Sequence, residues 1–231
     1  MAARHWRTTA RMGLGLASAA YVLTGAAGIA RADPKMGAVL AAQGNAASGL
    51  PACASCHGQN GEGDTSSDAI FPRLAGLSKP YLLKQLSDFR AARRRSSIMQ
   101  PIANAISTTE AEDLADYYSS ATAPSDPGTF PASLLKRGQK IAVRGRWSVR
   151  LPSCESCHAP GGIGVAPNFP YLADQRAQYI ETELRKWRTG KRRNDPLGLM
   201  KSVADKLRPA DIKAVAAYFQ SLNAPSRQGD K

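Results

Sequence analysis

The sequence is poor in cysteine and histidine, and it has no long apolar run after its N-terminal segment. Its 231 residues include four cysteines and three histidines. The cysteines form two local pairs, Cys53 with Cys56 and Cys154 with Cys157, whereas a disulfide scaffold joins distant segments. No later uncharged run could span a bilayer, and no convincing strand pattern is present. These absences exclude a disulfide-stabilised scaffold and several membrane spans, and they favour an all-α fold.

Acidic residues are scarce relative to basic ones. The chain has 31 Lys and Arg residues against 18 Asp and Glu residues, which gives a formal charge of +13. A field of this sign attracts acidic protein surfaces and anionic membrane surfaces. We therefore expect protein partners with acidic docking surfaces, with association to a membrane surface as a second option and no nucleic-acid partner.

The N-terminus has the composition of an export signal. Arg4, Arg7 and Arg11 precede an uncharged stretch at residues 12–30 that is rich in Ala, Gly and Leu. The stretch ends in Ala30-Arg31-Ala32, an A-x-A cleavage pattern. We expect a signal peptide at residues 1–32, cleaved after Ala32, with a retained N-terminal anchor as the alternative. Both interpretations place the rest of the chain outside the cytoplasm, in the periplasm.

Two copies of one pattern occupy nearly all of the remaining chain. Cys53-Ala54-Ser55-Cys56-His57 recurs 101 positions later as Cys154-Glu155-Ser156-Cys157-His158. Downstream, Phe71-Pro72 recurs as Phe169-Pro170 at an offset of 98, and Met99 recurs as Met200 at an offset of 101. Because a period of about 100 residues has the size of a domain, the pattern indicates a duplicated domain and not a solenoid.

A Pro/Gly-containing linker at residues 123–128 separates the copies, since it breaks a helix on both sides. We place the first copy at residues 33–127 and the second at 128–231. Helices are expected around residues 36–42 and 132–143, and from Ser107, whose capping box includes Glu110, and from Pro209. Apolar side chains at helical spacing predict one further helix in each copy: Leu82, Leu83, Leu86 and Phe89, and Ile180, Leu184 and Trp187.

The C-x-x-C-H motif is the attachment pattern of c-type haem. In it two thiols bond covalently to the edge of the porphyrin, and the histidine becomes the proximal iron ligand. A redox dithiol or half of a zinc site would also use C-x-x-C. However, neither needs the following histidine or a duplicated domain. We therefore predict two covalently bound haem c groups, attached at Cys53 and Cys56 and at Cys154 and Cys157, with His57 and His158 as proximal ligands.

The distal ligands follow by elimination. His5 lies in the export signal, so no histidine remains for a second axial position. Met99 and Met200 each follow the motif histidine by 42 positions and precede the last helix, each in an expected loop, whereas Met36 has no counterpart. A thioether ligand raises the potential and closes the sixth position, so electron transfer and not enzymatic oxygen chemistry is expected. The carbonyl group of Pro72, and that of Pro170 or Pro167, is a candidate to accept from the proximal histidine, unless these prolines only end a loop.

The order of these motifs resembles the dihaem cytochrome c family of the c-four type. The resemblance covers the mature chain and includes CASCH with FPRLAGL, CESCH with APNFPYLADQ, the two methionines and the two closing helices. It implies two tandem class I cytochrome c domains, each a small helical fold wrapped around one haem, in one periplasmic chain. Two departures are Asp174-Gln175, where the family has Gly-Gln, and the long segment 191–199 before Met200.

The family resemblance leaves three functions open. The chain could carry electrons from a quinol-oxidising complex to a terminal oxidase, act as the haem subunit of a periplasmic dehydrogenase, or, less in keeping with two methionine ligands, be a dihaem peroxidase. Charge divides the copies: residues 33–127 carry a net −2 and residues 128–231 a net +11. We expect many basic residues of the second copy to surround its haem edge and steer acidic partners: Lys186, Arg188, Lys191, Arg192 and Arg193.

Overall fold

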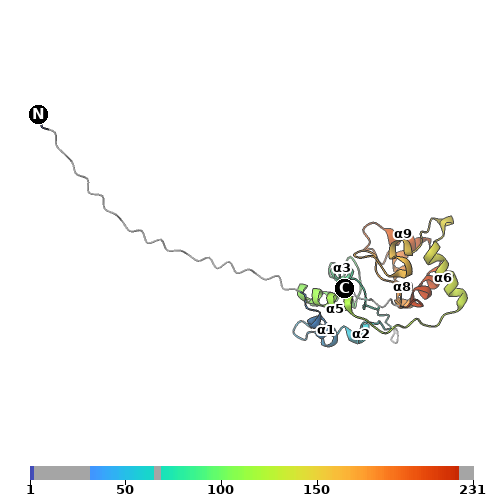
Figure 1. The fold of residues 1–231 in the computed structure, drawn as a ribbon, viewed down its shortest axis with the longest axis horizontal. Helices are drawn as coiled ribbons and strands as arrows, with labels where there is room; N and C mark the ends of the chain where they lie inside the picture. Colours follow the sequence, from blue (N-terminus) through green and yellow to red (C-terminus); the bar gives the residue numbers. More distant parts are fainter. Residues whose placement is uncertain (3–31, 65–68, 224–231) are drawn as a thin grey trace. The chain divides into compact units, whose positions relative to one another are not determined.

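The computed structural model describes residues 1–2, 32–64 and 69–223 (Figure 1). Within these residues the regular structure is helical, and strand pairing is limited to four isolated bridges, so the all-α expectation is confirmed. The expected signal at residues 1–32 lies almost entirely outside the described residues. Among the helices described, none is long and apolar enough to cross a membrane.

The two copies contain the same helices in the same order. The first copy has α1 (Pro34–Gln43), α2 (Ala54–His57), α3 (Lys79–Arg90), α4 (Met99–Ala105) and α5 (Thr108–Ser120). The second copy has α6 (Ala132–Arg144), α7 (Glu155–His158), α8 (Ala177–Arg188), α9 (Leu199–Lys206) and α10 (Pro209–Gln220), with 3₁₀ turns η1 (Trp147–Val149) and η2 (Pro160–Gly162). The bridges are matched too, Asn45–Leu50 with Arg146–Leu151 and Asp64–Phe71 with Val165–Phe169. The duplication is therefore present in the backbone, and each copy has its own apolar core.

In each copy the first and last helices cross at a glycine. A Cβ atom on Gly37 of α1 would lie 2.1 Å from the carbonyl oxygen of Asp113 in α5. A Cβ atom on Gly138 of α6 would lie equally close, 2.1 Å, to the carbonyl oxygen of Ala214 in α10. Because backbone atoms occupy this space, only glycine permits the crossing.

Replacing Gly138 with alanine should destabilise the second copy by about 2–4 kcal/mol, because α6 and α10 would have to move apart. Urea denaturation followed by far-ultraviolet circular dichroism measures the change. Ser133→Ala, at an exposed position of the same helix, is the matched control and should stay within about 0.5 kcal/mol of the unmodified protein. Equal stabilities of the two variants would contradict the close crossing.

The helix starts are partly as predicted. At α5 the hydroxyl of Ser107 accepts from the Glu110 N–H at 3.2 Å, and the Glu110 carboxylate accepts from the Ser107 N–H at 2.7 Å. Pro209 is the first residue of α10, also as predicted. The expected methionine loops are wrong, because Met99 and Met200 lie in the first turns of α4 and α9. These helices, of 7 and 8 residues, are too short to show a clear apolar period in the sequence.

Candidate haem sites

Each C-x-x-C-H motif folds into one helical turn. In α2 the His57 N–H donates to the carbonyl oxygen of Cys53 at 2.9 Å, and in α7 His158 makes the same bond to Cys154 at 2.9 Å. Since one turn spans 3.6 residues, this bond holds the first cysteine and the histidine of each motif close together. The local sequence spacing therefore becomes a compact group of two thiols and one imidazole in each copy.

The two histidines are held in one tautomer by proline carbonyl groups. His57 Nδ1 lies 2.9 Å from the carbonyl oxygen of Pro72, and His158 Nδ1 lies 2.8 Å from that of Pro170. A carbonyl oxygen only accepts, so Nδ1 carries the proton and Nε2 keeps its lone pair. Burial lowers the pKa of both histidines, which favours the neutral form that binds a metal. The prolines expected from the sequence are thus confirmed as Pro72 and Pro170, and Pro167 is not used.

The thiols lack the properties of a redox dithiol. All four cysteines are half-buried. Burial raises the pKa of Cys53 to about 11 and that of Cys154 to about 12. Reactive dithiol motifs lower the pKa of their attacking cysteine, so the shift here has the opposite direction. The uncharged sulfur atoms of Cys53 and Cys154 in an apolar wall suit thioether bonds instead.

All eight residues predicted as attachment points or ligands line one cavity of about 900 Å³. They are Cys53, Cys56, His57 and Met99 of the first copy and Cys154, Cys157, His158 and Met200 of the second. The remaining wall is largely apolar and includes Leu82 and Phe89 of α3 and Leu184 and Trp187 of α8. A flat, apolar macrocycle with a metal centre can be held by this set of groups. Two sulfur atoms can attach it covalently, an imidazole nitrogen and a thioether can bind the metal, and apolar side chains can pack against its faces. The residues therefore fit one haem in each copy.

The methionine segments are anchored by different side chains. The Met99 N–H donates to Ser96 Oγ at 3.1 Å, and the Met200 N–H donates to Asp195 Oδ2 at 2.5 Å. Asp195 belongs to the long segment that distinguishes the second copy. Each acceptor satisfies a backbone donor at a helix start, which positions the methionine at the cavity wall.

A buried polar cluster joins the copies beside this cavity. Arg94 of the first copy donates to Glu183 Oε2 at 2.9 Å and to the Tyr179 hydroxyl at 2.7 Å. Arg192 of the second copy donates to the same carboxylate oxygen at 2.7 Å. Burial alone would raise the pKa of Glu183, but the charges of Arg94 and Arg192 outweigh it and lower the pKa to about 2. Glu183 is therefore ionised at neutral pH and binds one arginine from each copy.

The cluster follows the internal repeat. Its members are paired at an offset of 98: Tyr81 with Tyr179, Gln85 with Glu183, Phe89 with Trp187 and Arg94 with Arg192. Each arginine also lies over the aromatic ring of its own copy, Arg94 at 4.7 Å from the Phe89 centroid and Arg192 at 4.6 Å from the Trp187 centroid. Among the polar pairs one differs: the amide of Gln85 in the first copy corresponds to the carboxylate of Glu183 in the second.

Arg192 is a correction to the sequence-based expectation of a basic rim. It is buried between the copies and donates to Glu183, so it contributes no exposed charge. Lys186 is held by the other Glu183 oxygen at 2.8 Å. Arg188, Lys191 and Arg193 are exposed, as a steering role requires. A run of charges in the sequence does not show which members are used as internal partners.

The long segment 191–199 also contacts the first copy. Asn194 Nδ2 donates to Gln85 Oε1 at 3.0 Å and to Asp88 Oδ2 at 2.7 Å. In return, Lys84 Nζ donates to the Asn194 carbonyl group at 3.1 Å. The segment therefore has two roles: Asn194 binds the first copy, and the adjacent Asp195 accepts a hydrogen bond from the Met200 N–H.

The second departure from the family pattern, Asp174-Gln175, is also an interdomain contact. Asp174 has a φ of 55°, in the left-handed region, where the matching residue of the first copy is Gly76. Its buried carboxylate lies 2.9 Å from Arg73 Nη1, and it accepts from the Asp126 N–H of the linker at 3.0 Å. Gln175 pairs with the Arg73 backbone in both directions, at 2.8 and 3.0 Å. The side chain that replaces glycine thus gains a charged partner across the copies.

These interface residues were missed in the sequence. The repeat contained a usable signal, because a tyrosine and an arginine recur at the offset of 98, Tyr81 with Tyr179 and Arg94 with Arg192, near positions that are apolar in both copies. Matched buried polar residues in a duplicated chain indicate a contact between the copies.

Comparisons with known proteins agree with this geometry. The Cytochrome c family profile matches residues 41–122 and 135–223. A thiosulfate dehydrogenase electron acceptor from Stutzerimonas stutzeri is 41% identical over 181 residues, which cover 78% of this chain and 83% of that protein. The reduced cytochrome c4 of Pseudomonas stutzeri has a similar structure, with a TM-score of 0.72 and 33% identity over 83% of this chain and 100% of its own.

A thiosulfate dehydrogenase structure from Marichromatium purpuratum also matches, with a TM-score of 0.75 and 37% identity over 84% of this chain. The match covers 43% of that longer chain. The two family matches lie in the two copies, and in each the C-x-x-C-H motif sits in the cavity wall. The chain belongs to the cytochrome c family and is a dihaem electron-transfer protein of the cytochrome c4 type, with two covalently bound haem c groups.

Proposed function

We propose that the protein is a periplasmic electron acceptor for a dehydrogenase, and that thiosulfate dehydrogenase is the donor class. Two observations support the donor class: the 41% identical relative and the structural neighbour are both named for that system. In this proposal the reduced cytochrome then passes its electrons to a terminal acceptor. A carrier between a quinol-oxidising complex and an oxidase is the second candidate, favoured by the likeness to cytochrome c4.

The proposed ligand set supports electron transfer without catalysis. Cys53 and Cys56 would attach the first haem, with His57 and Met99 as axial ligands. Cys154 and Cys157 would attach the second, with His158 and Met200. The bound haem supplies a one-electron couple at its iron. Each proline carbonyl group fixes its histidine with Nε2 facing outward from the hydrogen bond, and the apolar wall excludes water. With both axial positions filled, no coordination site remains for a substrate.

The proposed boundaries are a signal peptide at residues 1–32 and domains at 33–127 and 128–231. The linker supports the division, since it has no regular structure between α5 and α6 and is held by Arg73, which donates to the carbonyl groups of Pro124 and Ala123 at 3.1 Å. The mass of the mature protein tests the cleavage after Ala32.

Anaerobic mixing of the oxidised cytochrome with a purified thiosulfate dehydrogenase and thiosulfate tests the donor. We expect both haems to become reduced, as followed by their α-band absorbance, and no reduction when either the enzyme or thiosulfate is omitted. If the haems stay oxidised with thiosulfate but are reduced by a quinol-oxidising complex, the second candidate replaces the first.

A further inference from the structure

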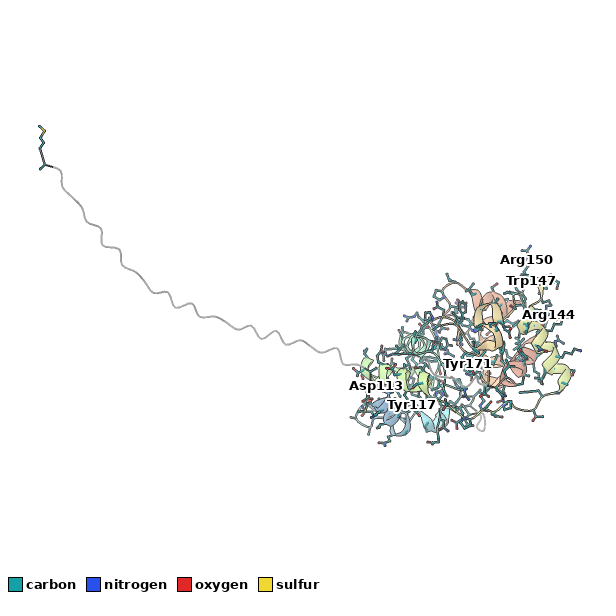
Figure 2. The ribbon with its side chains drawn as sticks, viewed as in Figure 1. Asp113, Tyr117, Arg144, Trp147, Arg150 and Tyr171 are labelled. Carbon is teal, nitrogen blue, oxygen red and sulfur yellow. The ribbon has the colours of Figure 1, made fainter. Side chains whose placement is uncertain are left out.

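The last turn of α6 and the loop that follows it carry an exposed aromatic and aliphatic surface with positive charge. Trp147 is 75% exposed, and Val143 and Val149 are each 44% exposed. Arg144 and Arg150 flank them and are exposed as well. Figure 2 shows Arg144, Trp147 and Arg150 projecting at the end of α6. Single exposed apolar residues are ordinary, but three together around a tryptophan indicate a contact surface. We call these five residues the Trp147 surface.

The fold does not require these side chains. The first copy builds the same loop with the same bridge, Asn45 with Leu50 in place of Arg146 with Leu151. Its residues at the positions of Arg144, Trp147, Val149 and Arg150 are Gln43, Ala46, Ser48 and Gly49. The loop therefore forms with small, neutral residues, and the large ones of the second copy need another explanation.

One position even carries a conformational cost. Arg150 has a φ of 54°, in the left-handed region, where its counterpart Gly49 has a φ of 71°. An L-residue with a side chain pays about 1–2 kcal/mol for this conformation, and glycine does not. A costly residue at an exposed site is typical of function more than of stability.

The Trp147 surface is held on a rigid base. Arg146 donates to Asp211 Oδ2 at 2.8 Å and to the Lys206 carbonyl group at 2.9 Å. Leu151, at the end of the loop, is fully buried. Its backbone exchanges two hydrogen bonds with Arg146, of 2.8 and 3.1 Å. Because these contacts hold the backbone of the loop, little backbone entropy is lost when Trp147 binds a partner, which favours affinity.

The positive charge of residues 128–154 favours a partner with an acidic surface. Between residues 128 and 154 the sequence has six basic residues and no acidic one. Arg137 and Arg146 are paired with Asp211. Within the described part of the chain, no salt bridge involves Lys136, Lys140, Arg144 or Arg150, and all four are exposed. Their charges remain available to attract an acidic surface.

The loop leads directly to the second haem site. Leu151 is followed by Pro152, Ser153 and Cys154, and these three residues line the cavity. The Trp147 surface is therefore joined through residues 151–153 of the chain to the wall that holds Cys154. Trp147 and two valines, flanked by arginines at a helix end and its loop, do not form the continuous apolar face of a membrane-surface helix, so a protein partner fits better than a lipid surface.

We propose that the Trp147 surface is where the electron-donating dehydrogenase docks, through an acidic face with an apolar recess for Trp147. This assignment rests on the proposed function, since the donor named there is the partner. It gives the second copy, and not the first, the task of receiving electrons.

Stopped-flow reduction by purified thiosulfate dehydrogenase and thiosulfate tests the assignment on the full-length protein with both haems. Trp147→Ala should lower the second-order rate constant by about tenfold or more, at low and at high salt. Arg144→Gln with Arg150→Gln should lower it at low ionic strength only, because salt screens the charges beyond about 10 Å at 0.1 M. The control Arg185→Gln with Lys213→Gln removes the same charge from exposed positions of the second copy that have no assigned steering role, and it should leave the rate within about twofold.

Reduction by ascorbate, a small donor that needs no docking, should be equal in all variants and shows that the haems are intact. If the unmodified protein is not reduced by the enzyme while ascorbate reduces it, the proposed function and this assignment both fall. If the enzyme reduces every variant at the rate of the unmodified protein, only the docking assignment falls. If the rates are unchanged and Trp147→Ala no longer co-sediments with phosphatidylglycerol vesicles while the unmodified protein does, the surface binds a membrane and not the dehydrogenase.

Discussion

Replacing Met200 with alanine is expected to lower the potential of the second haem by on the order of 0.1 V or more, within the roughly 0.8 V that axial ligands control. The thioether favours ferrous iron, and alanine removes it from the cavity wall. The open position should then bind carbon monoxide. Met99→Ala should have the same effect on the first haem alone. Spectroelectrochemical titration measures both potentials in each variant.

Met36→Ala is the matched control, because Met36 lies in α1 and is 50% exposed. It should leave both potentials and the six-coordinate spectrum unchanged. If Met200→Ala and Met99→Ala also keep their spectra and do not bind carbon monoxide, the axial ligands are other residues. If one variant alters both haems equally, the two sites do not hold separate ligand sets.

Replacing Glu183 with glutamine should destabilise the protein by about 3 kcal/mol at neutral pH, because the buried charges of Arg94 and Arg192 lose their shared partner. Thermal unfolding followed by circular dichroism measures the loss. Glu181→Gln is the control in the same helix. Among the described residues its salt bridge is with Arg185, at 3.3 Å near the surface, so the change should cost at most about 0.5 kcal/mol.

The effect of Glu183→Gln should depend on pH with a defined sign. The pKa of Glu183 is lowered from 4.5 to about 2 in the folded protein. A lowered carboxyl pKa stabilises the fold above the unfolded value and ceases to do so as the pH falls toward the folded value. The difference between the unmodified protein and Glu183→Gln should thus be constant from pH 7 to about 5 and shrink by more than half at pH 3. A difference that does not change over this range would contradict the ionised, paired state of Glu183.

Local and repeated features of the chain were predictable from the sequence. The two C-x-x-C-H motifs, the capping box at Ser107 and the proline carbonyl groups at Pro72 and Pro170 each depend on neighbouring residues or on a short turn. The duplication supported each motif with a second copy. The short helices whose first turns contain the methionines were missed, since their starts depend on the side chains of Ser96 and Asp195 and not on an apolar period.

The contact between the copies was not predictable in the same way. Arg192 lies in a basic run, and its sequence neighbours Lys191 and Arg193 are exposed. Its burial depends on Glu183, nine positions away on α8, and on Tyr81 and Gln85, more than 100 positions away. Asp174 likewise differs from the glycine of the family pattern, and its partner, Arg73, is about 100 positions away in the sequence. The burial and the partners of these residues depend on contacts between residues far apart in the chain, which a single sequence does not show directly.

The succession of Asn194 and Asp195 makes the second methionine segment harder to open than the first. For Met200 to leave the cavity wall, Asp195 must release the Met200 N–H, and Asn194 beside it is fastened to Gln85 and Asp88 of the other copy. Ser96 holds the Met99 N–H, and among the described residues Ser96 makes no hydrogen bond to the second copy, which this segment contacts at Arg94 instead. Exchange of methionine for an outside ligand, such as cyanide or imidazole, should therefore begin at the first haem. The protein would then hold one iron whose coordination responds to its surroundings and one whose coordination is secured by the neighbouring domain.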